Sequence, residues 1–433
     1  MSAERLWFII SVFLYVGGMF FSYLMYLNPV WDYYGFKYVE PELHEVCIVL
    51  VLIFFTSLFL PSQMRNPGSV IVLLLHCVVY VPGLVICLLV TKNGVLKYGY
   101  ILLALTVAFI VISLAARHAS AHGSIIKVET SRLGRRAVLA GWVTLAATLI
   151  YEYHSSMSFV GLENVYDQRA ETSTLGGAIS YVKTYFAYVL TPILFALGLN
   201  EKRPLYLIIG FCGFILMYMV SAERTIFLMP FLILVFNWLL RKETGFGRSA
   251  SVIYLGLAAF VVFTSLFYAV NEIAALFGIY FLFRTLALPG LSISLYEDLF
   301  SRYGYTHWTH VKGVGSLVDG PKFFVSDDAW PQLGVLVGKY MYNAPGNNYN
   351  ANLFSGDGVA AAGAVGILCI SIPLSIWIYF LNKFSSAWDS RFSILIILPL
   401  GIILTNGHFF TMLLSFGGLF ALLFFSFFSS KKN

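Results

Sequence analysis

Long apolar runs alternate with short polar segments along most of the chain. Twelve of these runs approach or exceed the length of a membrane-spanning helix: 6–27, 46–60, 68–90, 98–115, 137–153, 183–199, 204–220, 225–240, 250–270, 359–381, 392–405 and 408–428. The pattern predicts an all-α polytopic membrane protein with about twelve transmembrane helices. Nine helices and a loop over 153–183 would occupy residues 1–270, a large loop residues 271–358, and three helices residues 359–433.

Composition supports this fold class. The chain is 59% hydrophobic and only 11% charged, which is more apolar surface than one soluble core can bury, so a soluble enzyme is a poor fit. The first apolar run is followed by Asn28-Pro29 and not by a small-residue cleavage site, so we expect it to be retained as a helix. All five cysteines lie in or beside apolar runs, and we predict no disulfide and no cysteine metal site.

The net charge of +6 would suggest a nucleic-acid partner, but the positions of the charges indicate a membrane topology instead. If the N-terminus is cytoplasmic, 16 of the 27 lysines and arginines fall in cytoplasmic segments, together with only 5 of the 21 acidic residues. Basic residues are retained on the cytoplasmic side during insertion. We therefore expect both termini in the cytoplasm and no nucleic-acid partner.

The same rule decides how residues 273–291 are interpreted, because this stretch is apolar enough to span. A thirteenth crossing would move Lys383, Arg391 and the Lys431-Lys432 tail to the outside, against the charge rule. We therefore predict a helix that lies on, or dips into, the outer membrane surface and ends at Pro289-Gly290.

Three arginines lie where topology alone would not place them. Arg169 and Arg224 fall in outer loops, and Arg284 interrupts the apolar stretch 273–291. An arginine at membrane depth costs roughly 2.5–3.5 kcal/mol, so Arg284 needs a partner. One interpretation is a snorkelling side chain or an ion pair; the other is a phosphate clamp, since guanidinium offers paired donors that fit phosphate oxygens. The carboxylates considered for an ion pair are Glu223, Glu297 and Asp298.

The histidines divide into two groups. His76 and His408 lie in or at the ends of apolar helices, where packing or a satisfied polar contact is the expected role. His307 and His310 fall in the outer loop, three residues apart, with no evident third or fourth metal ligand, so the pattern favours no metal site. His310 is the better candidate for a general base that titrates near neutral pH.

Several enzyme classes are excluded by the absence of their motifs. The chain has no nucleophile elbow, no phosphate-binding glycine loop and no dinucleotide fingerprint in context. Chemistry on the outer face has no ready supply of nucleotide sugars, so a glycosyl donor there would carry its own activation, as a lipid pyrophosphate does. Aromatic residues of the large loop could stack on sugars, although interfacial belts of Trp and Tyr are the commoner cause of such enrichment. These aromatic residues are Trp308, Trp330, Tyr340, Tyr342 and Tyr349.

The order of these features resembles a known family. A middle outer loop with an arginine, the short Glu223-Arg224 turn, and a late large loop ending in Asn350-Ala351-Asn352-Leu353 before a glycine-rich helix start are similar to the O-antigen polymerase (Wzy) family and the related O-antigen ligases. The glycines are Gly356, Gly358, Gly363 and Gly366. The resemblance covers most of the chain as architecture, through short motifs.

The resemblance implies a multi-pass enzyme of the bacterial inner membrane. It would transfer a growing glycan from undecaprenyl pyrophosphate to a lipid-linked repeat unit at the periplasmic face, without a metal or other cofactor. Arg169, Arg224 and Arg284 would hold the pyrophosphate. The resemblance leaves the general base unassigned; our candidate is His310, followed by Glu297, Asp298 and Tyr349. The residues predicted to bind substrate are Trp308, Lys312, Tyr349 and Asn350.

Three other functions remain open. The ligases carry a His-Asn pair where this chain has Tyr349-Asn350, which argues against a ligase. A transporter that flips lipid-linked oligosaccharide would show inverted repeats and polar or broken helices near the midplane, whereas the charges here cluster outside the spans. A non-catalytic assembly partner is the third. The expected partners are the lipid-linked oligosaccharide, the bilayer and a chain-length regulator.

Overall fold

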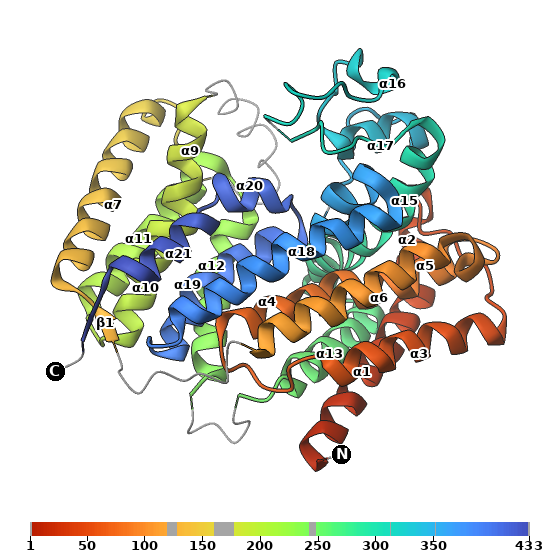
Figure 1. Ribbon diagram of the computed structural model, residues 1–433, viewed down its shortest axis with the longest axis horizontal. Helices are drawn as coiled ribbons and strands as arrows, with labels where there is room; N and C mark the ends of the chain where they lie inside the picture. The colour runs from red at the N-terminus through yellow and green to blue at the C-terminus, as the bar shows by residue number, and fades with distance from the viewer. Residues whose placement is uncertain are drawn as a thin grey trace.

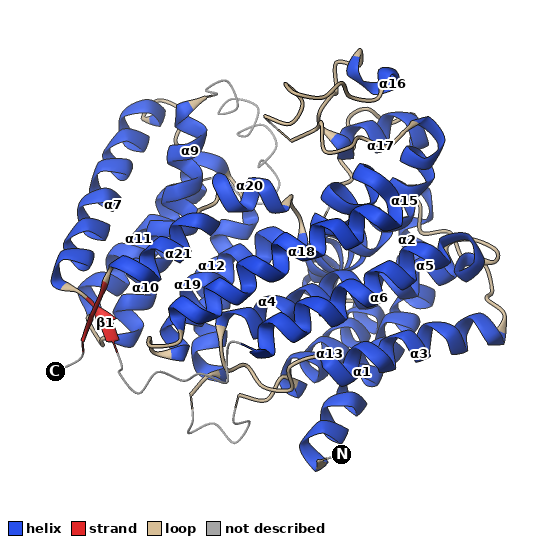
Figure 2. Cartoon of the chain, in the orientation of Figure 1, coloured by secondary structure: helices blue, strands red, loops and turns tan. Residues whose placement is uncertain are grey.

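The computed structural model describes residues 2–118, 128–159, 177–241, 248–311, 313–350 and 352–431. It is a bundle of helices, with one short two-stranded sheet near the C-terminus (Figures 1 and 2). In Figure 1 both chain ends lie toward the bottom of the view, and the small helices α16 (Lys322–Val325) and α17 (Leu333–Tyr342) lie at the top. The predicted all-α membrane class agrees with this architecture.

Most of the chain is helical, and in the labels η marks π-helical turns apart from η2, which is a 3-10 turn. The first half contains α1 (Ala3–Ser22), η1 (Tyr23–Leu27), α2 (Asn28–Trp31), η2 (Asp32–Tyr34), α3 (Leu43–Phe59), α4 (Pro67–Leu75), η3 (His76–Tyr80), α5 (Val81–Leu89), α6 (Gly94–His118), β1 (Val128–Thr130), α7 (Arg132–Tyr153), α9 (Ala178–Tyr185), η5 (Phe186–Leu190) and α10 (Thr191–Asn200). The second half contains α11 (Pro204–Ser221), α12 (Arg224–Leu239), α13 (Ser251–Phe267), α14 (Glu272–Phe277), η6 (Gly278–Ala287), α15 (Leu288–Tyr303), η7 (Phe354–Val359), α18 (Ala360–Ser385), α19 (Ser390–Thr405), α20 (Phe409–Leu414), α21 (Gly418–Phe427) and β2 (Ser429–Lys431).

Within the described residues, nine helices are long and apolar enough to cross a membrane, and four apolar helices are shorter. All twelve predicted apolar runs are helical. Four of them form the shorter helices α3, α12, α13 and α19, while the ninth long helix is Glu272–Tyr303, which we had expected at the membrane surface. The helix Pro67–Leu89 is apolar on all sides, and the apolar window that defines it is 100% buried, so it lies inside the bundle.

Proline explains where several helices are distorted. Four π-helical turns are each followed directly by a helix that has proline at its second position: Pro29, Pro82, Pro192 and Pro289. Proline has no N–H and its ring collides with the carbonyl four residues earlier, so the preceding turn widens. The long helices of this bundle are therefore bent at defined places.

Contacts between loops and helix ends form two sets, one at each end of the bundle. One end, which we call the basic end, is joined by Arg5 to Leu60, Asn66 to Ala116, Arg135 to Glu201, Arg248 to Ser390, and Asn382 to Ala116. The opposite end is joined by Val39 to Leu89, Tyr26 to Tyr268, and Lys97 to Asp298. Each set contains only loops that the charge pattern assigned to the same side of the membrane.

The helix Glu272–Tyr303 begins and ends at the opposite end. It starts just after Tyr268, whose ring packs against Tyr26 with centroids 4.8 Å apart. Near its other end, Asp298 forms an ion pair of 2.7 Å with Lys97, which lies in the first turn of α6. Between these ends, Phe283 of η6 stacks on Trp31 with ring centroids 3.8 Å apart, so the middle of the helix lies at the same end of the bundle. The helix continues through Pro289, where the sequence predicted its end.

The segment that leads into α18 folds back on itself. The backbone of Ala362 and Gly363 is non-helical, and Gly363 has φ of 58°, a left-handed conformation that glycine adopts without strain. Gly358 and Gly366 then pack so closely across the break that a side-chain carbon on Gly366 would collide with the carbonyl of Gly358. The helical segment predicted to begin at residue 359 therefore begins at Phe354, with a short half-helix that doubles back on α18.

Candidate functional site

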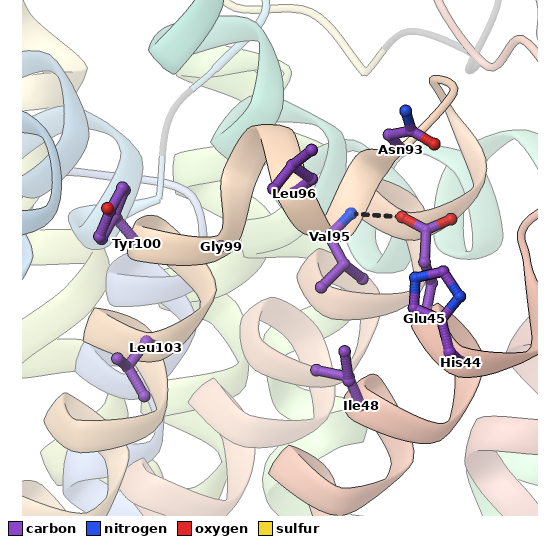
Figure 3. Close-up of a pocket in the computed structure, with 9 residues that line it drawn as sticks. All are labelled: His44, Glu45, Ile48, Asn93, Val95, Leu96, Gly99, Tyr100 and Leu103. Carbon is purple, nitrogen blue, oxygen red and sulfur yellow. Dashed lines mark hydrogen bonds between the residues drawn. The ribbon is translucent and has the colours of Figure 1, made fainter.

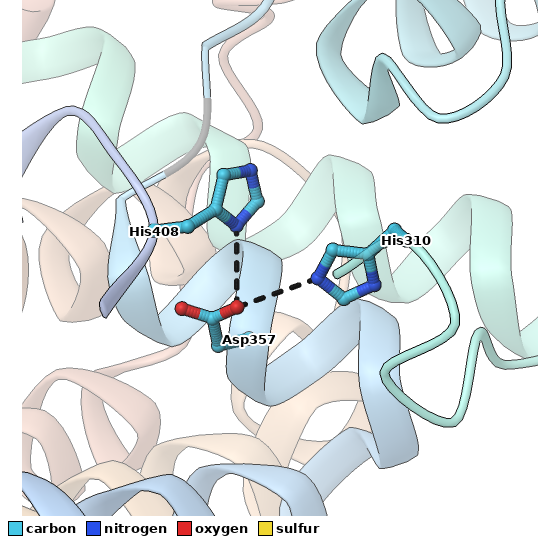
Figure 4. A group of neighbouring side chains, drawn as sticks. All are labelled: His310, Asp357 and His408. Carbon is cyan, nitrogen blue, oxygen red and sulfur yellow. Dashed lines mark hydrogen bonds and ion pairs between the residues drawn. The ribbon is translucent and has the colours of Figure 1, made fainter. Parts of the chain in front are cut away.

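Three side chains from distant parts of the chain meet beside this helix break. His310 comes from the loop after α15, Asp357 from η7, and His408 from the turn between α19 and α20 (Figure 4). His310 Nε2 and His408 Nδ1 each lie 3.4 Å from the same atom, Asp357 Oδ1. We call these three residues the His-Asp-His cluster.

The helix break holds the His310 loop in place. Because α18 is interrupted at Ala362 and Gly363, the carbonyls of Ala360 and Ala361 accept hydrogen bonds from the N–H groups of Thr306 (2.8 Å) and His307 (3.0 Å). These bonds fix the backbone a few residues before His310. The loop is therefore positioned by the same feature that turns η7 back onto α18.

The chain between these anchors is strained. His307 and Trp308 both have positive φ, 47° and 61°, which is uncommon for residues with a side chain. The strain is held in part by Trp308, whose indole N–H donates to the carbonyl of Asp357 at 2.8 Å. Strained backbone of this kind is concentrated at functional sites, which supports a role for the cluster beyond packing.

The cluster is buried but reachable from one side. The side chains of His310 and Asp357 are 3% and 0% exposed, whereas that of His408 is 29% exposed. The second oxygen of Asp357 accepts the backbone N–H of Phe409 at the start of α20, and His310 Nδ1 lies 2.8 Å from Thr306 Oγ1. A ligand would approach past His408.

Burial and charge act in opposite directions on the two histidines. Burial lowers the pKa of His310 below its usual value, although the hydrogen bond and the charge of Asp357 oppose the shift. For His408, burial also acts to lower the pKa, but the carboxylate of Asp357, 3.4 Å away, outweighs it, and the pKa is raised. The net pKa shift is therefore downward for His310 and upward for His408.

Two of the three predicted arginines are brought together at the opposite end of the bundle. The guanidinium carbon of Arg224 lies 4.1 Å from the centroid of the Tyr280 ring, and Tyr280 precedes Arg284 by one turn of η6. Arg284 is exposed, and its guanidinium carbon lies 5.4 Å from the Phe283 ring centroid and 5.8 Å from that of Tyr34. Arg169 lies outside the described residues.

The carboxylates proposed as ion-pair partners for Arg284 are engaged elsewhere. Asp298 binds Lys97, Glu297 accepts the Tyr305 hydroxyl at 3.3 Å, and Glu223 accepts the Tyr188 hydroxyl at 2.8 Å. Among the described residues, Arg284 has no ion pair within 4.0 Å. The guanidinium of Arg284 therefore faces solvent while it lies near the rings of Phe283 and Tyr34.

The predicted substrate-binding residues are not gathered in one place. Tyr349 is 0% exposed and lies between the rings of Tyr34 and Tyr342, with centroids 4.3 Å and 5.1 Å away, so its faces are already covered and we leave it out of the proposed site. Asn350 is exposed, and Trp308 is half-buried beside the cluster. Lys312 lies outside the described residues.

Sequence reasoning did not select Asp357 or His408. In the sequence, Asp357 stands out only by its place between Gly356 and Gly358 at the end of the large loop, and the position of His408 beside an apolar run predicts packing. Their meeting depends on contacts across 51 positions that no local pattern shows. The available signal was weak: a carboxylate between two glycines at the start of an apolar helix, where a charge is costly to bury without partners.

No direct contact joins the arginines to the cluster among the described residues, but Tyr188 connects the two regions. Its hydroxyl donates to Glu223, the residue before Arg224, and its ring lies edge-on to Phe416, which follows α20. Tyr188 belongs to η5, so the Arg224 region and the region of the His-Asp-His cluster both lie next to this helix. His408 and Phe416 lie on the two sides of the short helix α20.

A separate groove of about 480 Å³ lies between α3 and α6 (Figure 3). Its walls are largely apolar and include the highly exposed Leu96 and Tyr100. The buried carboxylate in its wall, Glu45, is already used, since it accepts the backbone N–H groups of Val95 and Glu42. We therefore interpret the groove as part of the lipid-facing surface and not as a reaction site.

Comparison of this chain with family models, curated proteins and solved structures gives no match, so the geometry described above carries the functional argument by itself.

Proposed function

We propose that this protein is a membrane glycosyltransferase that polymerises lipid-linked oligosaccharide repeat units, as the resemblance to O-antigen polymerases suggests. The observation that carries the proposal is the arrangement of Arg224 and Arg284 over one aromatic helix face at the opposite end of the bundle. Two guanidinium groups from segments 60 residues apart, set on aromatic rings beside a membrane, fit a pyrophosphate headgroup.

The proposed orientation has twelve crossings, with both termini in the cytoplasm and the arginines at the periplasmic face of the bacterial inner membrane. It is supported by the distribution of basic residues and by the two sets of loop contacts, which never mix loops assigned to different sides. The helix Glu272–Tyr303 is not counted as a crossing, because both of its ends lie at the same end of the bundle.

The proposed reaction is a displacement at the anomeric carbon of the donor glycan. A hydroxyl oxygen of the acceptor repeat unit forms the new bond, and the bond from the anomeric carbon to the undecaprenyl pyrophosphate breaks. The pyrophosphate leaves with the bonding electron pair, and the hydroxyl proton passes to a base on the outer face. Arg224 and Arg284 stabilise the charge that grows on the leaving group.

The acceptor hydroxyl would be received near the His-Asp-His cluster. The cluster lies outside the long part of α18, at a helix break, and opens on the side of His408. A buried carboxylate flanked by two imidazoles on a strained loop is an arrangement typical of reaction sites. We therefore keep His310 as a residue near the acceptor hydroxyl, now as one of the three residues of the His-Asp-His cluster.

Transport of the lipid-linked oligosaccharide is the second candidate, because two broken helices meet inside the bundle. The side-chain amide of Asn352 donates to the carbonyl of Pro289 at 2.8 Å and to Ser355 Oγ at 2.9 Å. Broken helices with polar groups at depth are typical of transporters. Asn352, Ser292 and Ser355 are all 0% exposed and bond to one another, which favours a structural joint over a substrate path.

The test is reconstitution of the purified protein in liposomes with a repeat unit linked to undecaprenyl pyrophosphate and no nucleotide. We expect a ladder of glycan lengths on a gel. Movement of the substrate to the other leaflet without a ladder would overturn the polymerase in favour of transport. Product that forms only after addition of a lipid-core acceptor would indicate a ligase instead.

A further inference from the structure

We propose that the His-Asp-His cluster binds a divalent transition-metal ion, with zinc as the best fit. His310 Nε2, Asp357 and His408 Nδ1 each offer one ligand atom, and all three atoms lie within 4.8 Å of one another. Two imidazoles and one carboxylate are a common ligand set for zinc and for ferrous iron. This assignment departs from the metal-independent route that the family resemblance implies.

The distances fit ligands of one shared metal ion. Hydrogen bonds from a charged imidazole to a carboxylate measure about 2.7–2.9 Å, whereas both histidines stand 3.4 Å from Asp357 Oδ1. In a tetrahedral zinc site with bonds of about 2.0–2.1 Å, neighbouring ligand atoms lie about 3.3–3.4 Å apart. The two separations from Asp357 therefore match ligands of one tetrahedral ion, and binding would bring the two ring nitrogens, which lie within 4.8 Å of each other, to a similar distance.

The ring nitrogens of His310 and His408 that face Asp357 also favour a metal ion. His408 Nδ1 is buried and has no hydrogen-bond partner among the described residues, although a buried ring nitrogen normally has one. His310 Nδ1 lies 2.8 Å from Thr306 Oγ1; with the proton on that nitrogen, the lone pair of Nε2 faces Asp357. A metal would satisfy both facing nitrogens at once.

The surroundings supply the outer contacts that metal ligands usually have. Thr306 orients the His310 ring, and the backbone N–H of Phe409 holds the other oxygen of Asp357. The indole of Trp308 fixes the backbone of Asp357 from the third side. The positions of all three ligands are thus set by the protein before an ion binds.

The fourth position of the ion would open toward solvent on the side of His408, whose side chain is the most exposed of the three at 29%. Three protein ligands and one open position are typical of catalytic zinc. If the proposed polymerase reaction holds, the acceptor hydroxyl would bind at this position, and the ion would lower its pKa so that its proton leaves near neutral pH. This role rests on the proposed function, whereas the metal site does not.

The test begins with the metal content of the full-length protein, purified in lipid nanodiscs with any histidine tag removed. We expect about one transition-metal ion per chain, and near-complete loss in His310→Gln, Asp357→Asn and His408→Gln. His307→Asn is the matched control: His307 is exposed, lies three residues from His310 and has a positive φ that asparagine tolerates, so this variant should keep its ion.

A second measurement uses the unmodified protein, in case the ligand variants fold poorly. After removal of the ion by a strong chelator, titration with Co²⁺ should produce the visible absorption of a tetrahedral site, and Zn²⁺ should abolish it. Thr306→Val should weaken metal affinity by about 10- to 100-fold and leave the stoichiometry unchanged. Wild-type protein that takes up neither ion, or takes them up as the three ligand variants do, would overturn the site.

These results separate the metal site from the proposed function. A bound ion in a protein that makes no glycan ladder would leave the site intact and reject the polymerase. A ladder made by wild-type protein that takes up neither Zn²⁺ nor Co²⁺ would reject the metal site and leave the polymerase intact.

Discussion

Two buried histidine sites in this bundle differ in a way that separates packing from chemistry. His76, inside the helix Pro67–Leu89, is 0% exposed, and both of its ring nitrogens face neutral hydroxyls: Tyr254 at 2.8 Å and Thr56 at 3.3 Å. His310 and His408 instead converge on one carboxylate at 3.4 Å, and His408 is partly open to solvent. A histidine whose ring nitrogens both face neutral hydroxyls serves the core, whereas two histidines that face one carboxylate offer the ligand atoms of a binding site.

The first prediction concerns Asp357, the residue of the His-Asp-His cluster that both histidines face. Asp357→Asn removes the charge that both histidines face but keeps the side-chain shape and an acceptor for the Phe409 N–H. We expect bound metal and glycan product to fall to background, with the amount of folded protein in the membrane little changed. Metal analysis and the gel ladder measure both, and a variant that retains either at the wild-type level would contradict the role given to Asp357.

The second prediction concerns the arginines that the proposal assigns to the pyrophosphate. Arg284→Ala should reduce product by about 10²- to 10³-fold, the usual effect of losing one charge-stabilising donor, and should leave metal content unchanged. Arg284→Lys should recover only part of the activity, because an ammonium cannot replace a bidentate fork. Initial rates from the gel ladder provide the measurement.

Arg302→Ala is the matched control for this pair, since Arg302 is an exposed arginine near the end of α15 to which we assign no role. Equal losses in Arg284→Ala and Arg302→Ala would mean that the effect is one of general surface charge, and the clamp would be rejected.

The third prediction changes the other histidine site. His76→Ala leaves a cavity and removes the partner of the Tyr254 hydroxyl, so the free energy of unfolding should fall by about 2–4 kcal/mol. The protein that remains folded should keep its metal and its rate per molecule. Denaturation in detergent, paired with metal analysis, checks both, and a loss of metal without a loss of stability would erase the distinction between the two sites.

The smallest effect is expected from Thr306→Val, which removes the hydroxyl that orients His310. Glycan product at low zinc should fall by about 10-fold or less and should recover when zinc is added, because Thr306 positions a ligand and is not itself one. A zinc titration of the rate separates this behaviour from a structural defect, which added zinc would not repair.

The fold class could be predicted because membrane helices leave a strong local pattern. Each apolar run became a helix, and Pro29, Pro82, Pro192 and Pro289 mark the bends. The fold-back of η7 onto α18 could not be predicted in the same way. The break at Gly363 depends on how Gly358 and Gly366 pack across it and on the Thr306 loop that uses the released carbonyls, none of which is a property of the local sequence.

The candidate site was only partly accessible from the sequence. Arg224, Arg284 and His310 attracted attention because charged or titratable groups at the outer face lack a topological reason to be there. His408 did not, because its flanking residues Gly407 and Phe409 are as uninformative as those around His76. What distinguishes the two histidines is Asp357, and that contact exists only after η7 folds back against α18.

The most direct test of the proposed function counts two products in one reaction. Liposomes with wild-type protein and the lipid-pyrophosphate-linked repeat unit would be sampled over time for glycosidic bonds formed and for undecaprenyl pyrophosphate released. The account predicts one pyrophosphate carrier released for each bond formed, with both falling together in Arg284→Ala. Release of the carrier without new bonds, or movement of the substrate across the bilayer with neither product, would contradict it.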